Sequence, residues 1–157
     1  MNYSELTAAI KGYAENDFPD TVGSFTSATQ IATFVEETEQ RVFNAVQLLD
    51  LRKNVIGSAT ANNKYLEAPS DWLANFSLAV IDPVTGEYEY LLDKDVNFIR
   101  QSYPSPTDTG KPQHYGYWDQ NTFILGPTPD LSYQMELHYF YYPESIVTAG
   151  TSWLGDN

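Results

Sequence analysis

Apolar residues recur every three or four positions in the first third of the chain, which is the spacing of one face of an α-helix. The pattern predicts a short helix at Ser4–Glu15, with Ser4 as its N-cap. It predicts a longer amphipathic helix at about Thr29–Leu51, with a length of about 33 Å. Pro19 and Gly23 predict a loop between the two helices. The apolar stripe of the first helix is Leu6, Ala9, Ile10 and Tyr13, and that of the second is Ile31, Phe34, Val35, Thr38, Val42, Ala45, Val46 and Leu49.

Beyond Gly57 the pattern changes to alternating or continuous apolar runs, which predict β-strands. The predicted strands are Lys64–Ala68, Asn75–Ile81, Glu87–Leu92, Gln113–Trp118, Thr122–Leu125 and Leu131–Tyr142. Turn residues separate them at Pro69–Trp72, Asp82–Gly86, Asp119–Asn121 and Gly126–Asp130. Apolar residues at helical spacing within Asp93–Tyr103 predict one or two amphipathic helical turns there.

The last predicted strand alternates most regularly. Its aromatic and apolar side chains fall on one face, which is the pattern of a strand with one buried side. Glu136 and His138 fall on the other face. The members of the apolar face are Tyr133, Met135, Leu137, Tyr139 and Tyr141.

The order of these elements predicts an α+β fold: N-terminal helices, one of them long and amphipathic, with an antiparallel β-sheet or meander. We expect a helical part at residues 1–56 and a β-rich part at residues 57–157, joined in one compact structural unit.

The excess of acidic over basic residues narrows the classes of partner that the protein can bind. Eight Lys and Arg against 21 Asp and Glu give a net charge of −13, and the basic residues do not cluster. Binding of nucleic acid or of an anionic membrane surface needs clustered cations, so neither is expected. No apolar run approaches the length of a membrane span, and the start of the chain lacks the pattern of a signal peptide. There is no cysteine, which excludes disulfides and thiolate chemistry.

Catalytic motifs are not visible. His114 and His138 stand alone, without the HExxH spacing of a zinc site, so we expect no metal site and no cofactor. The nucleophile motif GxSxG and the phosphate-binding loop motifs do not occur. We therefore predict no catalytic residues and no enzymatic activity.

Two alternatives remain at this point. A carboxylate-based hydrolase would need a pair of acids, such as Asp71 or Glu87 with Glu136, but nothing in the spacing selects a pair. A carbohydrate-binding β module, from a phage tail or a secreted protein, would use exposed tryptophans as stacking platforms. Its candidate platforms are Trp72, Trp118 and Trp153. Buried aromatics of a sheet explain the same pattern more simply.

The order of several short motifs resembles the head-to-tail adaptor proteins of tailed phages, a family that completes the head and forms the neck. The resemblance extends from about Gln30 onward. Upstream it rests on a helix with Phe34, Val35, Glu39 and Arg41, and on a turn with Leu66, Pro69, Asp71 and Trp72. Downstream it rests on Gly110, Pro112 and Tyr115, on Gly126, Pro127 and Pro129, on the strand Tyr133–Tyr142, and on the pair Trp153 and Leu154.

The resemblance implies a structural virion protein that forms a ring, commonly of twelve copies, between the portal protein and a tail tube or nozzle protein. The ring would be assembled in the host cytoplasm, would lie in the virion neck and would line the channel through which DNA passes without specific binding. Chains of the family usually continue past the Trp-Leu pair into terminal helices, whereas this sequence ends at Asn157. The copy number, the host and the residues that contact portal, tail or DNA channel stay open.

The charge sets a physical condition on such a ring. Copies that each carry −13 repel one another at short range, so apolar contacts must offset the repulsion. We expect the stripe of the longer helix and the tyrosines of the last strand to hold copies and neighbouring proteins together. An acidic inner wall would repel DNA and let the genome slide.

Overall fold

The computed structural model describes residues 1–18, 26–46 and 48–151, and the chain divides into two compact units. The helical unit comprises Met1–Leu48 and Tyr142–Asn157, and the β unit comprises Leu49–Tyr141. Both ends of the chain therefore belong to the helical unit. No described helix has the length and apolar character that a bilayer span requires.

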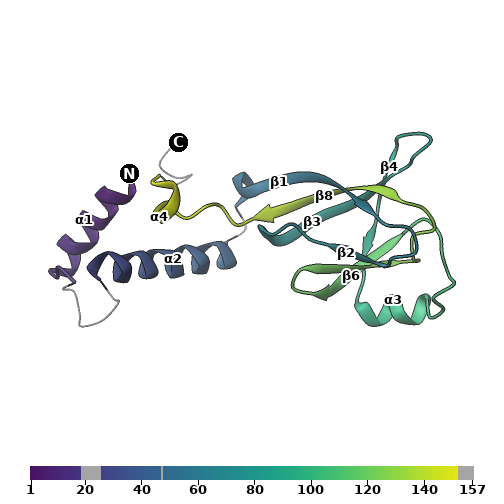
Figure 1. The fold of residues 1–157 in the computed structure, drawn as a ribbon, viewed down its shortest axis with the longest axis horizontal. Coiled ribbons are helices and arrows are strands. Elements are labelled where there is room, and N and C mark those ends of the chain that lie inside the picture. Colours follow the sequence, from purple (N-terminus) through teal and green to yellow (C-terminus); the bar gives the residue numbers. More distant parts are fainter. Residues whose placement is uncertain (19–25, 47, 152–157) are drawn as a thin grey trace. The chain divides into compact units, whose positions relative to one another are not determined.

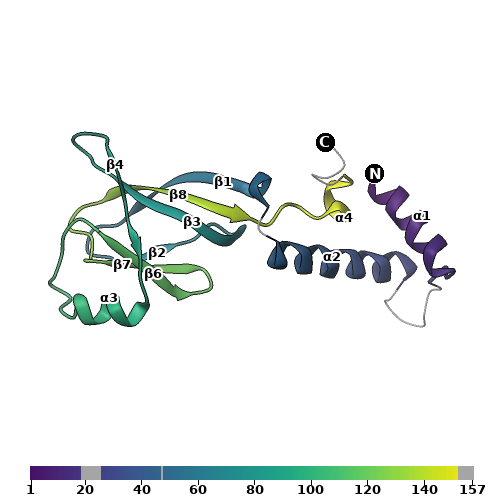
Figure 2. The ribbon, with the colours of Figure 1, turned by 180° about the vertical axis from the view of Figure 1, so that it is seen from behind.

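The helical unit contains α1 (Tyr3–Ala14), α2 (Ser27–Ala45) and the short α4 (Ile146–Ala149) (Figures 1 and 2). Ile31 and Val35 of α2 and Ile146 of α4 form its buried core. The backbone N–H of Tyr3 donates to the carbonyl oxygen of Gly150 at 2.9 Å, which ties the start of α1 to the end of α4. Partly buried residues pack on this core: Tyr3, Leu6, Ile10, Phe18 and Val147.

The prediction of Ser4 as the N-cap of the first helix is wrong by two residues. Asn2 caps α1, and its side chain accepts the backbone N–H of Glu5 at 2.9 Å. The Glu5 carboxylate accepts the backbone N–H of Asn2 at 3.0 Å, which completes a capping box. Leu6 and Ile10 face inward as expected, but Tyr13 is 93% exposed.

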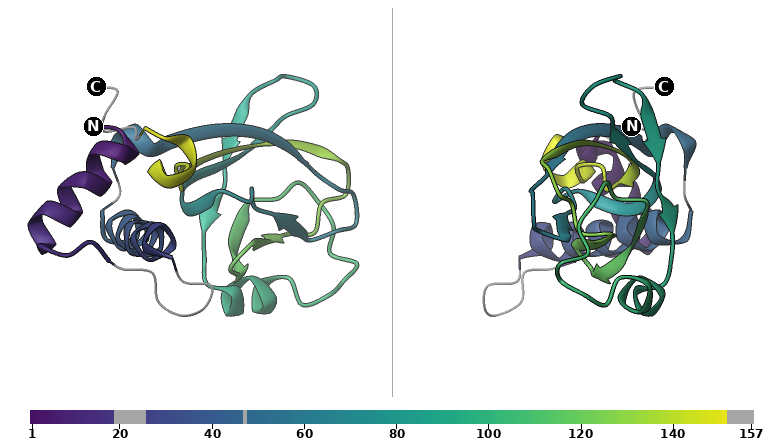
Figure 3. Two further views of the ribbon diagram at one scale, coloured as in Figure 1. Left: turned by 60° about the vertical axis from the view of Figure 1, so that its left-hand side comes forward. Right: turned by 90° about the vertical axis from the view of Figure 1, so that its right-hand side faces the viewer.

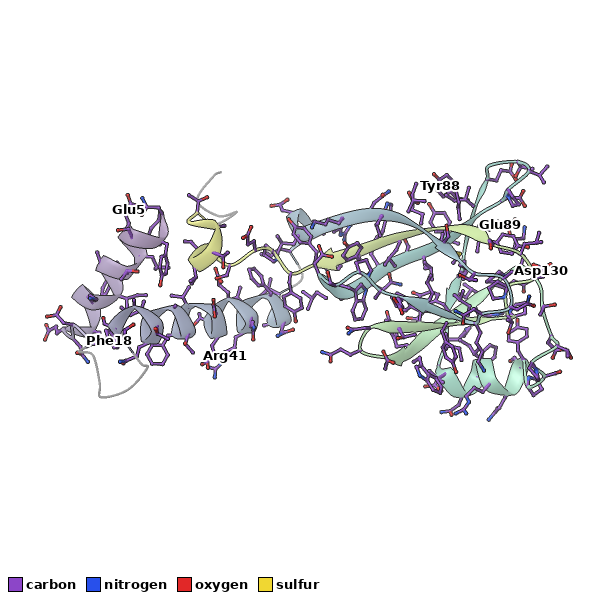
Figure 4. All side chains as sticks on the ribbon, viewed as in Figure 1. Glu5, Phe18, Arg41, Tyr88, Glu89 and Asp130 are labelled. Atoms are coloured by element: carbon purple, nitrogen blue, oxygen red, sulfur yellow. The ribbon has the colours of Figure 1, made fainter. Side chains whose placement is uncertain are left out.

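The second helix is shorter than its apolar pattern predicts. It ends at Ala45, and Val46 has extended backbone angles, so the predicted continuation to Leu51 is wrong. Leu49–Leu51 instead form a single 3₁₀ turn that leads into the first strand. Phe34 and Val42 of the predicted stripe stay exposed, while Arg41 projects from the side of α2 away from α4 (Figure 4). The predicted loop residues Pro19 and Gly23 lie outside the described residues.

The β unit consists of two four-stranded sheets. The first has the order β1-β8-β3-β4, with β1 at Arg52–Ala59, β8 at Tyr133–Tyr141, β3 at Trp72–Ile81 and β4 at Tyr88–Tyr90. The second has the order β2-β7-β6-β5, with β2 at Tyr65–Glu67, β7 at Thr122–Gly126, β6 at His114–Asp119 and β5 at Leu92–Asp93. All pairings are antiparallel except that of β5 with β6.

The two sheets enclose one core. In the first sheet Leu137 of β8 lies opposite Val55 of β1 and Leu78 of β3, and its side chain is 5% exposed. Phe123 of β7 and Tyr115 of β6 approach the same core from the second sheet. Figure 3 shows the two sheets as layers, with α3 (Val96–Ser102) on the far side of the second sheet.

Helix α3 packs closely on two glycines of the second sheet. A Cβ atom on Gly126 would lie 2.7 Å from the ring of Tyr103 and 2.9 Å from Ile99. A Cβ atom on Gly116 would overlap the carbonyl oxygen of Lys94. Only glycine leaves room for the helix and for the chain entering it, which explains why β6 and β7 carry these residues.

The predicted α+β class is confirmed, with two sheets in place of a single meander. The strand β1 was not predicted, because its sequence RKNVIGSA shows no apolar alternation and all its residues except Ala59 are exposed. The expectation that the tyrosines of the last strand hold copies together is wrong for Tyr133 and Tyr139, whereas Tyr141 is only partly buried. Tyr133 and Tyr139 are 5% and 3% exposed and belong to the core of their own unit.

Candidate functional site

An open groove of the β unit lies between β1 and β2, the edge strands of the two sheets. It encloses about 600 Å³. Gly57 and Ser58 of β1 form one side, and β2 with the turn between β6 and β7 forms the other. The residues of this edge groove are Gly57, Ser58, Thr60, Asn63, Tyr65, Leu66, Glu67, Trp118, Asp119 and Thr122.

Two aromatic rings form the wall of the edge groove. The rings of Tyr65 and Trp118 lie 5.4 Å apart at an angle of 58°, and 36% and 41% of these residues are exposed. The ammonium group of Lys64 lies 5.4 Å from the centre of the Tyr65 ring, and the guanidinium of Arg100 lies 5.5 Å from that of Trp118. Both are cation–π contacts between residues of the same chain. The rings do not form a flat platform.

Two carboxylates accompany the rings. Glu67 lies at the end of β2 and Asp119 at the end of β6, and both are exposed. One oxygen of Asp119 accepts the backbone N–H of Asn121 at 2.9 Å, which forms the predicted turn. Among the described residues neither carboxylate has a Lys, Arg or His partner within 4.0 Å. The lining of the groove is therefore aromatic and acidic, while Lys64 and Arg100 lie beside its two rings.

The two histidines lie apart, in different sheets. The Nδ1 of His114 is 3.0 Å from the hydroxyl of Tyr103 at the end of α3. His138 lies on the solvent side of β8, where its Nε2 is 3.0 Å from the amide of Asn54. In residues 1–18, 26–46 and 48–151 no three acidic or histidine side chains converge as metal ligands.

The carboxylates considered as a catalytic pair are not brought together. The Asn54 amide donates to Glu136 at 2.6 Å on the outer face of the first sheet. Asp71 accepts the hydroxyl of Tyr139. Glu136 and Tyr139 both belong to β8, but the Tyr139 side chain lies on its inner face. Burial raises the pKa of Asp71, but hydrogen bonds from Lys53 and Tyr139 outweigh this effect and lower it. Glu87 is exposed, just before β4.

The tryptophans also separate. Trp72 packs against the core, with its ring 5.7 Å from that of Phe123 and 5.9 Å from that of Tyr117. Trp118 borders the edge groove, and Trp72 is not among the residues that line it. Trp153 and Leu154 lie outside the described residues. Trp72 therefore does not serve as a platform beside Trp118.

Sequence reasoning found Trp118 but missed the rest of the edge groove. One part of its lining comes from β1 and β2, and the other from the ends of β6 and β7, about 50 residues later in the sequence. In the sequence Gly57 marks only the change from helical to strand spacing, and the structure shows that a Cβ atom there would have no neighbour within 4 Å.

Comparison with known proteins adds a whole-chain relationship. A family model described as the SU10 adaptor protein matches residues 1–157. A search of curated proteins found no match. The family match covers both units described above, including the segments on which the resemblance to phage neck proteins rests. The chain therefore belongs to the SU10 adaptor protein family, a family of phage head-to-tail adaptors.

Proposed function

We propose that this phage adaptor forms a ring between the portal protein and a tail tube or nozzle protein, commonly with twelve copies, and that the ring lines the DNA channel. The observation that carries the proposal is the family match over residues 1–157. A head-to-tail adaptor has to bind proteins on two sides, and a closed ring provides two such sides around a passage. Its role would be structural, in the virion neck, with no catalytic step.

The charge of the chain supports a channel that does not hold DNA. With a net charge of −13, a wall built from several copies would repel phosphate groups. Six of the eight basic residues lie in the β unit, and each has a ring or carboxylate partner within the chain. Acidic residues also outnumber these cations, by 21 to 8 over the whole chain. We infer that the genome passes without specific contacts.

Sizing with light scattering tests the ring. We expect the purified adaptor to elute as a monomer or a weakly associated species. Adding purified portal protein should produce a complex in which adaptor and portal co-migrate, and images of it should show a ring with a central hole. An acidic protein of similar size, mixed with portal in the same buffer, controls for nonspecific association. Absence of co-migration would argue strongly against the proposal.

The structure of that complex tests the channel. We expect Asp, Glu and neutral side chains on its inner surface, and no retention of double-stranded DNA by the ring at physiological salt. A channel lined with Lys and Arg would end the idea of an acidic wall, even if the ring itself forms.

A further inference from the structure

We infer that the edge groove between β1 and β2 binds an extended segment of a partner protein, and that this segment places a Lys or Arg side chain between the aromatic wall and the two carboxylates. The inference rests on the proposed adaptor function only for the source of the segment, since an adaptor has to hold another protein. The residues that carry it are Gly57, Tyr65, Glu67, Trp118 and Asp119.

The first step is the free backbone of β1. This strand of eight residues pairs with β8 on one side, and no described strand pairs with its other side. An exposed edge of this length presents unpaired N–H and C=O groups to another strand. Proteins often recognise extended peptides by adding them to such an edge, with pockets for alternate side chains.

The second step is the pocket beside that edge. Gly57 and Ser58 of β1 themselves line the edge groove, so a strand added to β1 would pass over it. Gly57 has no atom within 4 Å of its missing Cβ, which keeps the entrance open. A side chain projecting from the added strand would meet Tyr65 and Trp118 on the opposite wall.

The third step is charge. Glu67 and Asp119 lie in the edge groove without a basic partner within the described chain, and the whole chain carries −13. A Lys or Arg from outside would pair with these carboxylates, and its alkyl chain would pack on the rings, which already contact Lys64 and Arg100. A neutral sugar would prefer a flat ring platform, which the angle of 58° between these rings does not provide.

The occupant is a different protein and not a second copy of this chain. A second copy would add another net charge of −13. It would also have few cations to offer, because the six Lys and Arg side chains of its β unit already contact rings or carboxylates. Only Lys11 and Arg41 of the helical unit remain.

Selection from a library of random nine-residue peptides, displayed against the full-length protein, tests the inference. We expect enrichment of extended peptides with a basic residue flanked by β-branched residues. Replacing that basic residue by norleucine, or N-methylating the backbone of the peptide, should weaken binding on the order of tenfold. Enrichment of acidic peptides, or no enrichment, would overturn the inference.

Variants of the protein locate the binding site. Gly57→Val should fill the entrance and abolish binding, and Glu67→Gln, Asp119→Asn and Trp118→Ala should each weaken it on the order of tenfold. Gly12→Ala is the matched control, because its added Cβ also has no neighbour within 4 Å but lies on α1. Thermal unfolding of each variant shows that it is folded. Equal binding by Gly57→Val and the unmodified chain would place the peptides elsewhere.

Two further measurements separate the alternatives. Peptides of residues 7–15 and 37–45, which contain Lys11 and Arg41, represent a second copy. If they bind this groove more tightly than the selected peptides, the occupant is the chain itself and the inference is wrong. If Gly57→Val loses the peptides but still forms rings with portal, the groove serves another partner and the proposed ring stands. Loss of rings in the unmodified chain would instead contradict the proposed function.

Discussion

Asp82 shows how a single carboxylate organises the loop between β3 and β4. Its Oδ1 accepts the backbone N–H groups of Val84 and Thr85 at 2.9 and 3.0 Å, and its Oδ2 lies 3.2 Å from the Lys111 ammonium. The N–H of Thr85, then that of Val84 and then Lys111 lower the pKa of Asp82 to about 2. All these contacts favour the ionised form.

The pKa of Asp82 predicts a dependence of stability on pH. Because the folded pKa is lower than the unfolded one, the ionised carboxylate stabilises the fold fully above about pH 4. That contribution is lost as the pH falls toward 2. Asp82→Asn keeps an acceptor of the same size but removes the charge. We expect it to lower the melting temperature at pH 7, with a difference that closes near pH 2.

Thermal unfolding followed by circular dichroism at several pH values measures this difference. Asp50→Asn removes a charge from an exposed aspartate at the start of the β unit and serves as the comparison. A constant difference between Asp82→Asn and the unmodified chain from pH 7 to pH 2 would show that the charge is not what stabilises the loop.

Tyr139 joins the core to a surface ion pair. Its hydroxyl donates to Asp71 at 2.8 Å, and Lys53 lies 2.7 Å from the other oxygen of the same carboxylate. Burial, followed by the neighbouring Asp71, raises the pKa of Tyr139 to about 12, so the hydroxyl stays protonated and donates. Tyr139→Phe should reduce the free energy of unfolding by about 1–2 kcal/mol.

Urea unfolding tests the effect of Tyr139→Phe, with the exposed Tyr88→Phe as a control expected to stay within about 0.5 kcal/mol of the unmodified chain. The pKa of Asp71, measured by NMR, should rise in Tyr139→Phe because one of its hydrogen bonds is lost. Equal stability of both variants would mean that the Tyr139 hydroxyl contributes nothing.

Local chemistry explains which elements could be predicted from the sequence. The turns at residues 82–86 and 119–121 were found because their Asp side chains bind backbone groups two or three residues away. The last strand was found because its buried face repeats every second residue. Strand β1 was not predicted because its position depends on pairing with β8, about 80 residues later. The end of α2 at Ala45 has no Gly or Pro signal in the sequence.

The candidate groove could not be predicted for the same reason. Trp118 was recognised as an aromatic of interest, but its significance depends on Gly57 and Tyr65, which only the two sheet edges bring near it. A groove between edges is a property of the sheet order, which the strand pattern alone does not determine.

Strand β6 packs closely against the segment that leads into α3, and this packing predicts that Gly116 cannot be replaced without loss of stability. A Cβ on Gly116 would overlap the carbonyl oxygen of Lys94, and that backbone is held by a hydrogen bond from the Lys94 N–H to Tyr115 at 2.8 Å. Gly116→Ala should therefore destabilise the protein by about 1–3 kcal/mol.

Gly57→Ala is the matched control for Gly116→Ala, because it adds the same methyl group to a strand where nothing lies within 4 Å. It should be neutral or slightly stabilising, since alanine loses less backbone entropy on folding. Chemical denaturation of both variants gives the comparison. Equal stabilities would show that α3 and its entry shift at little cost.

At the scale of the whole molecule, the acidic charge and the buried tyrosines change the view of how copies associate. Tyr133 and Tyr139 of β8 are buried in the β unit, so contacts between copies have to come from residues that remain exposed. Apolar side chains of this kind occur in both units, for example Phe34 and Val42 on α2 and Ile56 and Phe76 in the first sheet. Any assembly built on them brings chains of −13 together.

This repulsion predicts that salt promotes assembly. The screening length falls from about 10 Å at 0.1 M salt to about 3 Å at 1 M, which weakens repulsion between exposed charges while apolar contacts persist. We expect the fraction of adaptor in rings with portal, measured by sizing and light scattering, to rise with sodium chloride. A variant with Glu15→Gln, Glu37→Gln and Asp108→Asn carries three fewer negative charges at exposed positions and should assemble at lower salt. If salt instead dissociates the rings, ion pairs between copies or with portal hold the rings together. The apolar side chains named above are then not the main contacts.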